Sequence, residues 1–93
     1  MAKNIKKQNI PNLDQALTPE LLGQAIHARR TQSNLSIEDA ASFCGVAKQT
    51  FMNIEHGQHT SQLDTILKIC STLGIKLFIQ PWQLDDEVLN VWQ

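Results

Sequence analysis

Residues 35–57 constrain the fold more than any other part of this 93-residue chain. Ser36 and Asp39 open the segment with the spacing of a helix cap, and small apolar residues then recur at helical intervals. Gly45 can adopt the positive φ that a tight turn needs. A second helical pattern follows over about residues 47–56. The segment therefore predicts two short helices that are joined by a tight turn.

Two further helices are predicted, one on each side of this pair. Thr18 and Pro19 have the residue types of an N-cap and a first helical position. The apolar spacing that follows predicts a core face made of Leu22, Ala25, Ile26 and Arg29. Residues 63–73 are mostly apolar, and Gly74 is a typical residue for the end of that helix.

Residues 75–80 change the pattern, because they alternate with strand-like residues and stop at Pro81. A single short strand is unstable without a partner, and nothing else in the chain resembles a strand. The simplest partner is the same strand of a second copy, antiparallel across a twofold axis. The expected dimer interface consists of Ile75, Leu77, Phe78 and Ile79.

The expected fold is mainly α, with four helices followed by one C-terminal β-strand that pairs in a homodimer. The chain is divided into a flexible basic arm (1–17), a helical domain (18–74), the dimerising strand (75–80) and a tail (81–93). At 42% hydrophobic residues, the composition supports one modest core. The chain has neither a membrane-spanning apolar run nor a signal peptide, and its two cysteines cannot form a disulfide framework, so we expect a cytoplasmic protein.

The charge distribution decides whether nucleic acid is a plausible partner. The net charge of −1 argues mildly against it. However, six of the eight basic residues lie within the first 48 residues, and residues 85–87 are acidic, so one face can still meet phosphates. The basic residues in question are Lys3, Lys6, Lys7, Arg29, Arg30 and Lys48. The affinity of one copy should be modest, which again favours a dimer.

Two helices joined by a tight turn form a helix-turn-helix, whose second helix lies in the DNA major groove. Its expected solvent-facing side carries Lys48, Gln49, Thr50 and Asn53. Lysine suits guanine or a phosphate, and Gln and Asn suit adenine. The alternative is an ordinary solvated helix face, but the complete spacing favours DNA. Ser36 and His59 are further candidates for phosphate contacts.

Arg30 and Glu55 each end a predicted helix, and these ends should meet. A surface ion pair between them would contribute a few tenths to ~1 kcal/mol, so its expected role is to aim Arg30 at a phosphate. Two unrelated solvated charges are the alternative.

Neither a catalytic nor a metal site is predicted. His56 and His59 together with Cys44 or Cys70 match no known zinc spacing, and both cysteines fall on apolar helical faces. No nucleophile motif or Gly-rich loop is present, so we expect no enzyme activity and no cofactor. Trp92 either anchors a partner or folds back onto its own domain.

With these residues in view, residues 20–75 resemble the lambda-repressor-like (Cro-like, XRE) helix-turn-helix family. The similarity lies in the Leu-Ser-x-Glu-Asp-x-Ala opening, the Gly-Val turn, the Ile-Glu-x-Gly close and residues 63–74. The resemblance implies that Lys48, Gln49 and Asn53 read bases and that Arg30 and Glu55 are a paired charge. The family commonly has Gln where this chain has Ile37. This departure puts in doubt the contact with the DNA backbone that the Gln supports.

The flanks are Thr18-Pro19 before the first helix, a strand in place of a fifth helix, and a tail with Trp92 near its end. They resemble HipB-type antitoxins, which are encoded with a HipA-type kinase toxin. This resemblance implies a homodimer that binds double-stranded operator DNA and represses its own operon in the bacterial cytoplasm, at the nucleoid. It also implies a HipA-like serine/threonine kinase toxin as partner, alone or with an additional small subunit, and a role for Trp92 in docking or proteolysis. Two alternatives stay open: a plain phage-type repressor without a toxin, and a protein-interaction scaffold of a kinase complex with little DNA binding.

Overall fold

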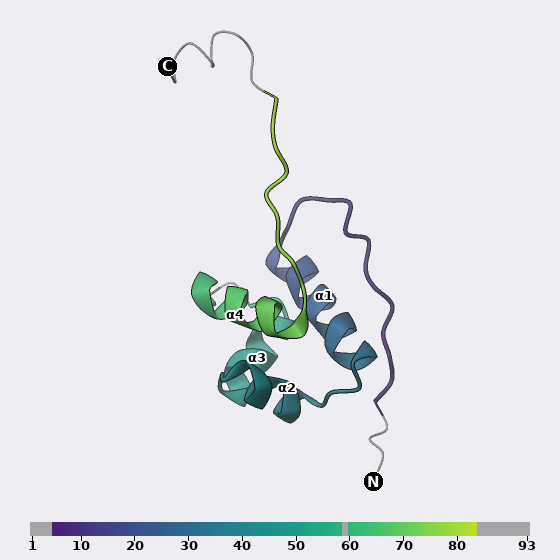
Figure 1. The fold of residues 1–93 in the computed structure, drawn as a ribbon, viewed down its shortest axis with the longest axis vertical. Coiled ribbons are helices and arrows are strands. Elements are labelled where there is room, and N and C mark those ends of the chain that lie inside the picture. Colours follow the sequence, from purple (N-terminus) through teal and green to yellow (C-terminus); the bar gives the residue numbers. More distant parts are fainter. Residues whose placement is uncertain (1–4, 59, 84–93) are drawn as a thin grey trace.

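The computed structural model describes residues 5–58 and 60–83, and these residues form four α-helices and no strand (Figure 1). The helices are α1 (Pro19–Gln32), α2 (Ile37–Cys44), α3 (Lys48–Glu55) and α4 (Leu63–Leu73). α1 and α4 pack on the α2–α3 pair, and α3 contacts both α1 and α2. The four predicted helices are confirmed, and each of them begins and ends close to its expected residues.

Local capping explains where the helices begin and turn. The Thr18 hydroxyl accepts a hydrogen bond from the Leu21 amide at 3.0 Å, and Pro19 occupies the first helical position. The Ser36 hydroxyl accepts from the Asp39 amide at 3.1 Å. Gly45 has φ +69°, a conformation that side chains with a Cβ disfavour, so it can join α2 to α3 without strain.

The core lies where the four helices meet. Its largest fully buried side chains are Phe51, Ile26, Ile69, Cys44 and Cys70. Burial raises the pKa of Cys70 to about 11, which keeps it a neutral thiol. The cysteines are therefore packing residues. No cluster of metal-ligating side chains occurs within residues 5–58 and 60–83.

The expected core face of α1 was wrong at Arg29, and Ala25 is only half-buried. Leu22 and Ile26 are buried, but the residue that continues this stripe is Arg30, while Arg29 is exposed. The reason is geometric, because steps of four residues keep one side of a helix directed at the core. Arg29 reaches the end of α4 instead, where its Nε donates to the Leu73 carbonyl oxygen at 2.7 Å.

Residues 75–80 leave the helical body without secondary structure (Figure 1). The expected strand is not observed in this single chain, because a strand needs a second strand to bond with, and residues 5–58 and 60–83 supply none. Ile75 and Leu77 pack against the core, whereas Phe78 and Ile79 are each 84% exposed. Pairing between two copies remains a prediction.

The N-terminal arm, as far as it is described (residues 5–17), contains neither helix nor strand, and it runs back along α1 (Figure 1). The Gln8 amide donates to the Thr31 hydroxyl at 3.0 Å, and Gln32 Nε2 donates to the Gln8 carbonyl oxygen at 2.7 Å. Two hydrogen bonds therefore hold the arm against the last turn of α1. In the described part of the chain, no helix has the length and apolar character to cross a membrane.

Candidate nucleic-acid interface

α3 separates its apolar and polar residues onto opposite sides. Phe51 and Ile54 are buried in the core, while Lys48 and Gln49 are exposed and Asn53 is half-buried. Gln49 Nε2 donates a hydrogen bond to Asn53 Oδ1 at 2.9 Å, so the two amides lie together one turn apart. The predicted polar side of α3 thus faces outward, and it presents a cation and two amides that suit the edges of base pairs. Thr50 is half-buried beside them.

Lys48 is already paired within the protein. Its Nζ lies 3.0 Å from Glu38 Oε1 on α2, and both side chains are more than half exposed. A surface pair of this kind is worth little, so a base or a phosphate could take Lys48 over at small cost. The pair orients Lys48 toward the beginning of α2.

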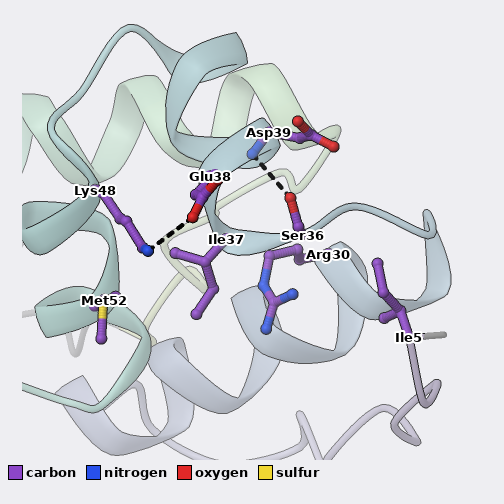
Figure 2. A pocket seen from close by; sticks show the side chains of 8 residues that line it. All are labelled: Ile5, Arg30, Ser36, Ile37, Glu38, Asp39, Lys48 and Met52. Atoms are coloured by element: carbon purple, nitrogen blue, oxygen red, sulfur yellow. Dashed lines mark hydrogen bonds and ion pairs between the residues drawn. The ribbon is translucent and has the colours of Figure 1, made fainter. Parts of the chain in front are cut away.

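An open hollow of about 750 Å³ lies between the start of α2, the outer side of α3 and the N-terminal arm (Figure 2). Ser36 and Ile37 line it from α2, Lys48 and Met52 from α3, and Ile5 from the arm. Met52 was not predicted, although its position one turn after Lys48 would have placed it on the same side of the helix. The hollow brings the predicted phosphate-binding end of α2 next to the predicted base-reading helix.

The structure confirms that Arg30 and Glu55 pair, but the pair is buried instead of lying on the surface. Their side chains are 8% and 3% exposed. Arg30 Nε and Nη2 donate to the two carboxylate oxygens of Glu55, both at 2.8 Å, and Nη1 donates to the Leu35 carbonyl oxygen at 2.8 Å. We therefore reassign Arg30 from a phosphate contact to a residue that fixes α1 against α3, because its guanidinium is committed inside the domain.

His27 joins this pair from the edge of the core, with its side chain 40% exposed, and it was not predicted from the sequence. Its Nδ1 lies 2.6 Å from Glu55 Oε1. His27 precedes Arg30 by three residues in α1, a spacing that would have placed both on one side of the helix. Burial by itself would raise the pKa of Glu55, but hydrogen bonds and charge from Arg30 and His27 outweigh it, so the pKa lies below its ordinary value. The end of α3 is thus held by an ionised carboxylate.

Two predicted site residues, His59 and Trp92, lie outside the described residues, as does the acidic cluster at 85–87. Ser36 is half-buried at the rim of the hollow, and its hydroxyl caps α2. The structure thus brings Ser36, Lys48, Gln49, Thr50 and Asn53 to the α2–α3 side of the domain.

Two helices joined at Gly45, with the second presenting a polar side outward, define a helix-turn-helix protein. The comparison with protein families agrees. Residues 21–76 match the Helix-turn-helix domain family, and the chain belongs to it. This is a family of DNA-binding domains and not of enzymes.

Individual proteins are similar to most of this chain. The chain is 29% identical over 79 residues to the uncharacterized HTH-type transcriptional regulator y4mF of Sinorhizobium fredii (strain NBRC 101917 / NGR234), covering 85% of this chain and 90% of the relative. Among solved structures, it is similar to a chain of a HipA-HipB-O2-O3 complex, with a TM-score of 0.66, 21% identity, and coverage of 76% of this chain and 100% of that chain. A chain of a HipB complex with an O2 20mer gives a TM-score of 0.67 at 21% identity, covering 77% of this chain and 100% of that one. At this identity, the structural matches establish the fold.

Proposed function

We propose that this protein is a sequence-specific transcriptional repressor that inserts α3 into the major groove of operator DNA. The observation that carries the proposal is the outward polar side of α3, where Lys48 lies beside the hydrogen-bonded Gln49 and Asn53. Lysine reads guanine, and the two amides read adenine. Ser36 and His59 take backbone phosphates beside this helix, and Thr50 adds a polar contact from the same side.

The proposal extends to a HipB-type antitoxin that acts as a homodimer in the bacterial cytoplasm, at the nucleoid. It is supported by the similarity in fold to chains of a HipA-HipB-O2-O3 complex and of a HipB complex with an O2 20mer. In this proposal, two copies pair through residues 75–80, and a HipA-like serine/threonine kinase toxin is the protein partner, alone or with an additional small subunit. Trp92 would dock on that partner.

Two other functions predict different neighbouring genes or different binding behaviour of the purified protein. A plain phage-type repressor would have no kinase gene beside its own. A scaffold of a kinase complex would co-purify with the kinase but shift no DNA. Purification of the protein from its native operon, followed by a gel shift with the upstream DNA, separates all three.

Replacing Lys48 and Gln49 together by Ala tests the base contacts. Each good side-chain pair with a base contributes about 1–3 kcal/mol, so the double variant should bind the operator roughly 100-fold more weakly. Helicity measured by circular dichroism should not change, because both side chains are exposed. Anisotropy titration with the DNA upstream of its own gene measures the affinity.

A matched control removes the same residue types from elsewhere. Lys68→Ala combined with Gln24→Ala makes the same change of charge at exposed positions on α4 and α1. This variant should bind within about threefold of the wild type, since surface changes of this kind are worth less than about 0.5 kcal/mol. Equal losses in both double variants would remove α3 from the interface.

Phe78→Asp tests the dimer. Phe78 is exposed in the single chain, so a charge at this position should break a strand interface without disturbing the core. Leu77 is less suitable, because it packs against the core of its own domain. Light scattering should report the mass of one 10.5 kDa chain for Phe78→Asp. It should report twice that mass for the wild type and for the control Gln83→Asp, at an exposed position outside residues 75–80. A dimer that persists in Phe78→Asp would rule out the strand interface at this residue.

A further inference from the structure

The cations at the interface do not fully account for DNA binding. Duplex DNA is bound mainly through phosphate neutralisation, which needs lysine or arginine side chains at the contact. The chain carries a net charge of −1. Of the two cations that line the hollow, Arg30 is buried against Glu55 and Lys48 is paired with Glu38. Lys48 can exchange Glu38 for DNA at small cost, but one cation neutralises only one phosphate, so further positive charge is needed from another element.

The N-terminal arm brings such charge to the same place. Ile5 is half-buried and lines the hollow together with Ser36 and Lys48 (Figure 2). Three residues later, the backbone of Gln8 is fixed on both sides, because its amide donates to Thr31 and its carbonyl oxygen accepts from Gln32. The chain between Ile5 and Gln8 is thus held at the junction of α1 and α2.

Lys6 and Lys7 are the two residues between these anchors. Both are exposed, and neither forms an ion pair with another residue in the described ranges 5–58 and 60–83. Nothing in the packing of the domain requires a lysine at either position. Their position beside the start of α2 suits phosphates that flank the groove occupied by α3.

We propose that Lys6 and Lys7 form a second DNA contact, in which the braced arm binds backbone phosphates next to the groove that receives α3. This inference rests on the proposed function, because it needs α3 to be on DNA. It assigns the arm a sequence-independent role, since phosphate contacts fix position and carry no base information. Gln32 is a positioning residue, because it holds the arm and does not touch DNA.

Lys6→Gln combined with Lys7→Gln tests the contact in the full-length protein. Each lost phosphate contact lowers the salt slope by about 0.9, so the slope of log affinity against log salt should fall by about 1.8. Between about 50 and 200 mM salt, wild-type affinity should then fall about twelvefold more than that of the variant. The weakening at low salt should be the same for operator and unrelated duplex, because phosphates are common to both.

Two further variants separate a contact made by the arm from an effect of net charge and from an effect of arm mobility. Gln24→Glu combined with Ser71→Glu makes the same change in net charge at exposed positions away from the hollow and should leave the salt slope unchanged. Gln32→Ala keeps both lysines but releases the arm, so affinity should fall about threefold, the cost of ordering a free segment, with the slope unchanged. Thermal unfolding of each variant checks that the domain stays folded.

The outcomes distinguish the arm contact from the proposed function. If the Lys6 and Lys7 variant retains the affinity and salt slope of the wild type while the Lys48 and Gln49 variant loses binding, the arm contact is wrong and α3 still binds DNA. If the Gln24 and Ser71 variant loses the same slope, the effect is one of net charge, which also overturns the contact. If wild-type protein binds no duplex, both proposals fail together.

Discussion

Gly23→Ala should lower the melting temperature by on the order of 10 °C, although alanine is the better helix former. Gly23 lies in the first half of α1, where the helix crosses the end of α3. A Cβ at this position would collide with the carbonyl oxygen of Glu55 and lie 2.9 Å from that of Ile54. These are backbone atoms, so the clash is relieved only by moving one helix away from the other.

The cost of this movement exceeds the gain in helix propensity. Overpacking costs about 1–3 kcal/mol, and separation of α1 from α3 would in addition disturb the bonds of Arg30 to Glu55. Gly→Ala in a helix raises the free energy of unfolding through helix propensity by at most ~1 kcal/mol. The matched control is Gln24→Ala, at an exposed neighbour in the same helix, which should change stability by less than about 0.5 kcal/mol. A melting temperature for Gly23→Ala at or above that of the wild type would show that the helices do not approach each other this closely.

The local signals in the sequence predicted the helices well. Thr18 and Ser36 cap their helices as their residue types indicate, and Gly45 takes the left-handed conformation at the turn. These features depend on residues within one turn of each other, so nearby chemistry decides them. The polar side of α3 was predictable for the same reason, because helical spacing alone separates Lys48 from Phe51.

Features that depend on distant segments were not predictable. The sequence around Gly23 gives no sign that this glycine is needed. The need arises because the backbone of α3 lies against it in the folded domain. The Arg30–Glu55 pair was predicted, but its burial results from how the helix ends pack, and Leu35 contributes an acceptor from outside both helices. The predicted strand at 75–80 is absent from the single chain, and its formation would need a second copy.

In the candidate site, too, the features set within one helix were predictable and the contacts between elements were not. Sequence spacing identified Lys48, Gln49 and Asn53, which share one side of one helix. It did not show that Glu38 pairs with Lys48, or that Gln8 fixes the arm at the end of α1. Each of these contacts joins two different elements of the fold. The composition of the arm predicted a free basic tail, so the two hydrogen bonds that hold the arm were not expected.

Glu55→Gln should reduce the free energy of unfolding by about 3 kcal/mol at pH 7, because it leaves the buried Arg30 guanidinium without a countercharge. Glutamine keeps the size of the side chain, so packing changes little and the loss reports the electrostatics. Asp14→Asn removes an exposed carboxylate and serves as the control, with an expected change below about 0.5 kcal/mol. Urea unfolding followed by circular dichroism measures all three proteins.

The pH dependence gives an independent test of the same group. Burial opposes ionisation of Glu55, but Arg30 and His27 outweigh it and lower the pKa of the folded state below its ordinary value of 4.5. The folded protein therefore binds fewer protons than the unfolded chain in this range, so the Glu55 contribution is complete above about pH 4.5 and is lost as the pH falls through the lower, folded pKa. Glu55→Gln lacks this titration, so its stability deficit relative to wild type should shrink between about pH 5 and pH 3, where carboxylates titrate. A deficit that stays constant over this whole range would mean that Glu55 stabilises the domain by its shape and hydrogen bonds and not by its charge.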